Sequence, residues 1–193
     1  MNVDRQQHTI ATPVRIEGIG LHTGKPVQME FIPADAGTGV VFIRTDLAGE
    51  PIIKADLANV VSTNRGTIIS ENGASVNTVE HVLAALRGSG VDNLVIRISN
   101  EEPPAGDGSS LKFVELVKQA GLVPQNADRT DCRVNEIFSL VEGEKSMVYL
   151  PSDRFEVTYH LAYRDNIIPP QHIHVVVDEQ SFVSRIGHAR TFG

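Results

Sequence analysis

The sequence has a single cysteine, no excess of basic residues and no long apolar run, and each shortage excludes a class of protein. With Cys132 as its one cysteine, the 193-residue chain cannot form an internal disulfide or a cluster of thiolate metal ligands. Its formal net charge of −7 disfavours the phosphate backbone as a partner, so we expect no nucleic-acid binding. No apolar run approaches the roughly 20 residues that a membrane-spanning helix needs, so we expect no integral membrane segment.

The first residues of the chain also lack the apolar core of a secretory signal, which predicts a cytoplasmic protein. Hydrophobic residues make up 41% and charged residues 21%, as in an ordinary soluble globular protein. A length of 193 residues suffices for one large domain, or for one complete domain with part of another.

The pattern of apolar residues changes from strand-like to helical along the first part of the chain. β-rich runs separated by glycine or proline predict strands at residues 9–16, 27–32, 40–43, 67–69 and 94–98. Apolar side chains at i, i+3, i+4 and i+7 from Val79 predict a helix that begins after Asn77 and ends near Gly88. A second helix is expected over residues 110–120, with Gly121 at its end. Strands followed by separate helices indicate an α+β fold.

Residues 125–130 are predicted to be a linker, because they are polar, follow a proline and show no periodicity. We therefore expect a first α+β domain at residues 1–124 and an incomplete second α+β domain at residues 131–193. Within the second part, strands are predicted at residues 134–141, 147–150, 155–163 and 173–177. A short helix is expected after Asp178, to about Ile186.

The strongest local chemical signal is the adjacent pair Glu80 and His81 at the expected start of the first helix. A carboxylate beside an imidazole at a helix start can supply a general base and a metal ligand. The same residues also fit a capping box, in which Glu80 bonds back to the Asn77 N–H and His81 is merely exposed. Local sequence leaves both interpretations open.

Two glycine-rich segments raise the same choice between a structural and a binding role. His22 lies in a turn with three glycines, which either lets the backbone approach a ligand or simply forms a hairpin. Asp107 or Ser109 can cap the second helix, and an anion bound at that helix start is a weaker interpretation.

His172 and His174 share one face of a predicted strand, about 7 Å apart. This spacing allows a weak surface metal site, although an ordinary strand face explains the pair as well. His174 and Asp178 would lie roughly 13 Å apart in a strand, which excludes them as ligands of one metal ion.

Six segments occur in an order and spacing typical of one family: GLHTG (20–24), RTDL (44–47), TVEHVLAAL (78–86), VDN (91–93), DGS (107–109) and ARTFG (189–193). Together they resemble the UDP-3-O-acyl-N-acetylglucosamine deacetylases of lipid A synthesis. The resemblance covers essentially the whole chain. It implies a fold of two similar α+β domains, each a sheet with two helices, and an active site between them.

The resemblance also implies a reaction, in which a zinc-dependent enzyme removes acetate from the 2-acetamido group of UDP-3-O-acyl-N-acetylglucosamine. By motif match, Glu80 resembles the general base and His81 a zinc ligand. Thr191 resembles the hydroxyl that stabilises the developing oxyanion, and Phe192 would line the pocket beside it.

Three further residues correspond to substrate-binding positions of the family. Lys145 matches a basic residue near the diphosphate. Tyr163 matches an aromatic side chain that stacks on uracil, a contact in which tyrosine can replace phenylalanine. His22, in the glycine-rich turn, is expected to contact the substrate as well.

The family's other zinc ligands form an H-K-x-x-D pair followed by a catalytic histidine, and this pattern does not occur in the sequence. A catalytic zinc usually has three protein ligands. We therefore expect this chain to be a fragment of such an enzyme that is inactive alone. The alternative is a naturally short, non-catalytic UDP-sugar-binding or interaction protein derived from the same fold.

Overall fold

The structure is a computed structural model that describes residues 6–130, 132–163 and 168–190. The chain divides into two compact units, one formed by Met1–Arg129 with Phe182–Gly193 and the other by Thr130–Ser181. Sheets and separate helices make the fold α+β, which confirms the predicted class. In the part of the chain that the structure describes, no helix is long and apolar enough to cross a membrane.

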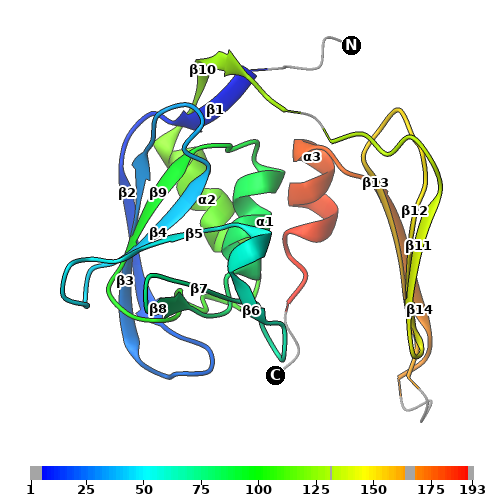
Figure 1. Cartoon of the computed structure of the whole chain (residues 1–193), viewed down its shortest axis with the longest axis horizontal. Helices are drawn as coiled ribbons and strands as arrows, with labels where there is room; N and C mark the ends of the chain where they lie inside the picture. The colour runs from blue at the N-terminus through cyan, green and yellow to red at the C-terminus, as the bar shows by residue number, and fades with distance from the viewer. Residues whose placement is uncertain (1–5, 131, 164–167, 191–193) are drawn as a thin grey trace. The chain divides into compact units, whose positions relative to one another are not determined.

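A five-stranded sheet forms one layer of the first unit, in the order β2-β3-β9-β4-β5 (Figure 1). Its strands are β2 (Val14–Ile19), β3 (Pro26–Pro33), β9 (Leu94–Ile98), β4 (Val40–Arg44) and β5 (Ile52–Lys54). Neighbouring strands are antiparallel except β4 and β9, which run parallel. Alternate residues of β3 and β9 are buried, which is the period of a strand that places one face on the core.

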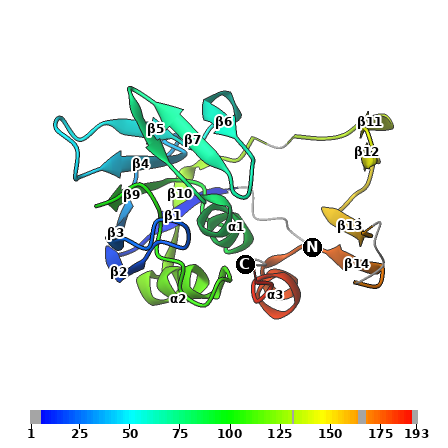
Figure 2. The same cartoon turned by 90° about the horizontal axis from the view of Figure 1, so that it is seen from below.

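Two helices form the other layer, and they lie side by side against one face of this sheet (Figures 1 and 2). They are α1 (Glu80–Gly88) and α2 (Leu111–Ala120), close to the predicted ranges. The apolar stripes of both helices are buried against the sheet, whose core side chains include Phe31, Phe42 and Ile96. Burial of each such side chain contributes about 1.5–3 kcal/mol.

A smaller sheet of three short strands leads the chain into α1. It consists of β6 (Val60–Ser62), β7 (Ile68–Glu71) and β8 (Ala74–Val76), which follow the 3₁₀ turn Leu57–Asn59. Strand β8 ends directly before the turn that begins α1. The orientation of this turn therefore depends on where the small sheet holds β8.

The position of the predicted helix after Asp178 is confirmed, but the helix is α-helical only at its start and then π-helical. It begins as α3 (Glu179–Ser181) and continues as the π-helical segment Phe182–Ile186. Phe182 is buried in the core of the first unit, and its ring packs over Gly88 of α1. A Cβ atom at residue 88 would lie 2.3 Å from Phe182 Cδ1, so only glycine leaves room for the ring.

The segment expected to be a linker, residues 125–130, is strand as far as Asp128. Strand β10 (Leu122–Asp128) pairs antiparallel with β1 (Gln6–Ile10), so it belongs to the first unit. Its proline is tolerated because β10 has one strand partner and lies at an edge. Local periodicity did not reveal this strand, because its polar residues form hydrogen bonds with residues that are far away in the sequence.

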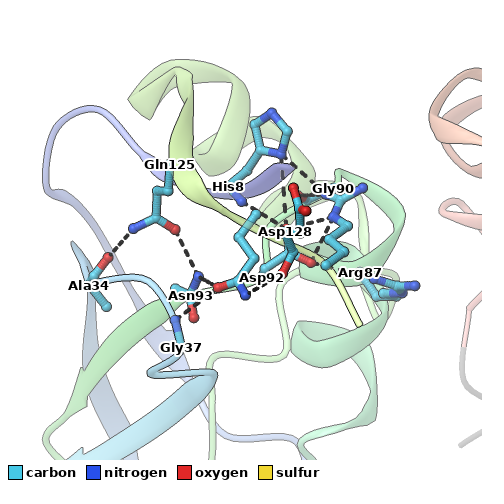
Figure 3. A network of polar contacts seen from close by, with 11 residues as sticks. His8, Ala34, Gly37, Arg87, Gly90, Asp92, Asn93, Gln125 and Asp128 are labelled. Carbon is cyan, nitrogen blue, oxygen red and sulfur yellow. Dashed lines mark hydrogen bonds and ion pairs between the residues drawn. The ribbon is translucent and has the colours of Figure 1, made fainter. Parts of the chain in front are cut away.

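A polar network joins β1 and β10 to the loop before β9 (Figure 3). Asp92 accepts hydrogen bonds from the His8 N–H and from Arg129 Nε, each at 2.8 Å. Asn93 donates from Nδ2 to Gln125 Oε1 at 2.7 Å. The VDN motif at residues 91–93 therefore connects strand β1 with strand β10.

The second unit contains two β hairpins, at the places where strands are predicted. Strand β11 (Phe138–Glu142) pairs with β12 (Lys145–Tyr149), and β13 (Glu156–Leu161) pairs with β14 (Gln171–Val176). Across the second hairpin, the rings of His160 and His172 stack with centroids 5.8 Å apart. His174 Nδ1 lies 2.9 Å from the hydroxyl of Thr158. The histidines of this strand face thus contact neighbours on the hairpin itself.

Candidate functional site

The start of α1 differs from the predicted capping box. Val79 occupies the N-cap position, and no side chain caps the helix. The Asn77 N–H donates to the Glu101 carbonyl at 2.7 Å, and Glu80 is bonded to Thr67. The capping-box interpretation is therefore wrong, because partners distant in the sequence hold the backbone before the helix.

Glu80 is half-buried at the first position of α1 and is fixed by one backbone group. Its Oε2 accepts the Thr67 N–H at 2.8 Å, and the Thr67 carbonyl accepts the Val79 N–H at 3.2 Å. Since an ionised carboxylate has about four lone-pair positions, Glu80 can still accept a hydrogen bond from a water molecule or a ligand.

The next side chain, His81, is half-buried and lines a small cavity. The cavity has a volume of about 20 Å³ and is otherwise lined by Leu21, Thr78, Pro103, Pro104, Ala105, Gly108 and Phe113. This volume is enough for about one water molecule. His81 therefore borders a recess at the helix start and is not merely exposed.

A buried carboxylate, Glu102, lies at the centre of the loops around this helix start. Glu102 is 1% exposed. It accepts hydrogen bonds from the His22 N–H at 3.0 Å, from the Thr23 N–H at 2.9 Å and from the Thr23 hydroxyl at 2.9 Å. The Thr78 hydroxyl donates to its other oxygen at 2.8 Å. One side chain thus connects the glycine-rich turn to the segment that begins α1.

Thr78 has a backbone conformation that β-branched residues rarely adopt. Its φ angle is +54°, in the left-handed region. Such a conformation costs about 1–3 kcal/mol and persists only where the surroundings hold it. The hydrogen bond from the Thr78 hydroxyl to Glu102 is one contact that holds it.

The hydrogen bonds to Glu102 keep its carboxyl group ionised. Burial alone would raise the pKa of Glu102, but the N–H groups of Thr23 and His22 and the hydroxyls of Thr78 and Thr23 outweigh it. The pKa of Glu102 is therefore held below its ordinary value of 4.5. A negative charge is thus stabilised inside the protein by oriented donors.

We expect Glu102→Gln to flatten the pH dependence of stability. A carboxyl group whose pKa is lowered by folding stabilises the fold fully above about pH 4.5, and this contribution is lost as the pH falls through its folded pKa. The free energy of unfolding should therefore fall more steeply on acidification in the wild type than in the variant. Urea unfolding between about pH 3 and pH 7 measures both curves. Parallel curves would contradict the prediction, and Glu101→Gln is the matched control.

Two further motifs have structural roles. The buried guanidinium of Arg44 donates to both carboxylate oxygens of Asp46, at 2.8 and 2.7 Å, and to the Ser75 carbonyl at 2.6 Å. The hydrogen bond from Arg44 holds the pKa of Asp46 below its usual range.

In the DGS motif, Asp107 accepts the Ser109 hydroxyl at 2.7 Å, and Ser109 in turn accepts the first N–H of α2, from Leu111, at 3.2 Å. Ser110 occupies the N-cap position without a side-chain cap, so neither Asp107 nor Ser109 is the N-cap residue, and Ser109 supports the helix start from the position before it.

The structure brings together three of the predicted site residues. Glu80, His81 and His22 belong to the first unit, and Glu102 and Thr78 connect the two segments that carry them.

The other predicted site residues lie elsewhere. Lys145, at the start of β12, and Tyr163, just after β13, are exposed residues of the second unit. Thr191 and Phe192 lie outside the described residues. The predicted roles of all of these residues stay predictions.

The described residues do not by themselves fit a catalytic zinc site. Such a site usually has three protein ligands. Throughout residues 6–130, 132–163 and 168–190, no three His, Cys, Asp or Glu side chains gather to hold a metal ion. His81 is one candidate ligand, and among the described residues His172 and His174 belong to no such group, although His174 Nε2 lies 3.5 Å from Glu156 Oε2.

The sequence did not single out Glu102 or Thr78. In sequence Glu102 resembles its neighbour Glu101, which forms a surface ion pair with Lys25 at 2.9 Å. The difference between the two carboxylates arises only when the glycine-rich turn folds over Glu102. At Gly20 of this turn, a Cβ atom would lie 2.6 Å from Glu102 Oε2, so the close approach requires glycine.

Comparison with known proteins identifies relatives along nearly the whole chain. The family model of UDP-3-O-acyl N-acetylglycosamine deacetylase matches residues 7–193. A UDP-3-O-acyl-N-acetylglucosamine deacetylase of Saccharophagus degradans is 37% identical over 190 residues, covering 97% of this chain and 63% of the relative. One of Syntrophotalea carbinolica is 40% identical over 187 residues, covering 97% and 60%. The chain thus spans about three fifths of the length of these relatives.

Proposed function

Because the chain belongs to the UDP-3-O-acyl-N-acetylglucosamine deacetylase family, we propose that it forms one side of the active site of such an enzyme. The proposed reaction is hydrolysis of the 2-acetamido group of UDP-3-O-acyl-N-acetylglucosamine in lipid A synthesis, in the cytoplasm. The observation that carries the proposal is the helix start, where Glu80 is held by the Thr67 N–H and His81 lines a cavity.

In this proposal Glu80 is the general base. A water molecule attacks the carbonyl carbon of the acetamido group while Glu80 takes a proton from the water. The C–N bond then breaks, acetate leaves, and the sugar amine takes up a proton. Positioned proton transfer of this kind contributes typically about 10²–10⁴-fold to a rate. The single hydrogen bond from Thr67 fixes the carboxylate and leaves lone pairs to receive that proton.

We propose His81 as one ligand of a catalytic zinc ion, with the others outside the described residues. Zinc, when bound, would polarise the substrate carbonyl and acidify the attacking water. Thr191 is the proposed oxyanion donor and Phe192 the side chain beside it. His22, Lys145 and Tyr163 are the proposed contacts to the UDP-sugar.

The two units also support a proposal about domains. The first unit, a sheet covered by two helices, would be a complete α+β domain of the family. The hairpins of the second unit would be the first part of a similar domain. Residues 182–190 pack with the first unit, so the segment that leads to the proposed oxyanion donor is attached to the domain that carries Glu80.

We expect the 193-residue chain with added zinc to release no acetate from UDP-3-O-acyl-N-acetylglucosamine, because it contributes one of about three zinc ligands. A hybrid of this chain and the remaining part of the Syntrophotalea carbinolica relative should release acetate. In that hybrid, Glu80→Ala should lower kcat at least about 100-fold. Acetate is measured with the Syntrophotalea carbinolica relative itself as the positive control.

The matched control is Glu115→Ala, since Glu115 is an exposed glutamate on α2. A hybrid without activity, beside an active positive control, would contradict the proposed function. It would favour the alternative of a non-catalytic binding protein. A hybrid in which Glu80→Ala and Glu115→Ala have the same rate would exclude Glu80 as the base.

A further inference from the structure

We propose that Glu102 is a positioning residue that sets the direction of the Glu80 and His81 side chains by holding Thr78 in its left-handed conformation. The inference rests on the proposed function of Glu80 and His81. It adds a buried residue that acts through the backbone before α1.

The charge of Glu102 is stabilised by oriented donors. The groups that lower its pKa against the effect of burial are the N–H groups of Thr23 and His22 and the hydroxyls of Thr78 and Thr23. A buried carboxylate keeps its charge only where several donors point at it. The positions of these donors relative to one another are therefore tied to the position of Glu102.

The connection from Glu102 to Glu80 is short. Thr78 is joined to Glu102 by its hydroxyl, and the next residue, Val79, donates its N–H to the Thr67 carbonyl. The Thr67 N–H then donates to Glu80. If Thr78 changed to an ordinary φ angle, the chain would enter α1 in another direction, and both bonds to Thr67 would be lost.

Glu102 also connects the helix start to the turn that carries His22. The His22 and Thr23 N–H groups donate to the same carboxylate that accepts the Thr78 hydroxyl. Leu21 of this turn and His81 line the same cavity. The proposed substrate-contacting turn and the proposed catalytic helix start thus share one anchor, so displacing Glu102 affects both.

Nuclear magnetic resonance of the 193-residue chain tests this proposal through the Thr67 amide. In the wild type, the Thr67 N–H donates to the Glu80 carboxylate, so its proton should resonate downfield of its position in Glu80→Ala, which removes this acceptor. In Glu102→Gln, we expect the Thr67 shift to lose its dependence on Glu80, while the amide shifts of β3 and β9 stay unchanged.

Thr78→Val is the second variant, because it keeps the branched shape and removes only the hydroxyl that bonds to Glu102. It should move the Thr67 proton shift toward its value in Glu80→Ala, even if Glu102→Gln fails to fold. The matched control is Glu101→Gln, which removes a surface ion pair beside Glu102 and should leave Thr67 unchanged. A wild-type Thr67 proton shift in Thr78→Val would overturn the proposal.

The measurement needs neither zinc nor substrate, so its outcome is separate from that of the acetate assay. An inactive hybrid with the expected Thr67 response would refute the proposed function and leave the positioning role in place. An active hybrid with an unchanged Thr67 response in Thr78→Val would support the proposed function and refute the positioning role of Glu102.

Discussion

Gly20→Ala is expected to lower the free energy of unfolding of the first unit by about 4 kcal/mol. The added Cβ atom would lie 2.3 Å from the Thr23 hydroxyl and 2.6 Å from Glu102 Oε2. Neither group can move away cheaply, because each is a partner in the hydrogen bonds around the buried carboxylate. The energetic costs of overpacking and of lost hydrogen bonds are therefore expected to add. Urea unfolding followed by circular dichroism measures the loss.

Gly37→Ala is the control for the general cost of replacing glycine. Gly37 has φ +81° and no atom within 4 Å of an added Cβ, so its replacement strains the backbone without a collision. We expect it to cost about 1–2 kcal/mol. A loss at Gly20 no larger than that at Gly37 would show that the turn can move away from Glu102, contrary to the structure.

Phe182→Ala should also have a large effect, a loss of about 3–5 kcal/mol from the first unit. Phe182 is 5% exposed, and its ring occupies the space that Gly88 leaves open on α1. Removing the ring leaves a cavity in the core and leaves only the partly buried Val183 and Ile186 as the apolar side chains of residues 182–190 known to pack against it. Urea unfolding measures the stability, and hydrogen exchange of the α1 amides shows whether the loss lies at this helix.

Phe155→Ala is the matched control for that substitution. Phe155 is 68% exposed in the second unit, so the same change of side chain should cost less than about 1 kcal/mol there. If Phe182→Ala and Phe155→Ala had equal effects, residues 182–190 would not be part of the core of the first unit.

Much of the fold follows from local patterns in the sequence. The apolar spacing from Val79 predicted α1, and alternating runs predicted the main strands, because burial of one face imposes the period of each element. Gly121, expected to end α2, does so with φ +74°. The family was identified from six short motifs, and the comparison confirms it over residues 7–193.

Local patterns failed where a segment is held by distant partners. Strand β10 reads as a polar linker, but Gln7 near the start of the chain donates to the carbonyl of Asp128, 121 positions away. The start of α1 reads as a capping box, but Thr67 and Glu101 supply the partners. In both places the backbone donors and acceptors had to be satisfied, and the sequence does not show which group satisfies them.

The sequence by itself therefore determined the α+β class, the helices, the family and the pair Glu80 and His81 as candidates. Tertiary structure alone decided how that pair is oriented. The carboxylate at the centre, Glu102, takes its donors from His22 and Thr78, which are 80 and 24 positions away. Burial distinguishes Glu102, which is 1% exposed, from Glu101 beside it, whose side chain is 32% exposed, and this difference arises only when the loops fold over Glu102.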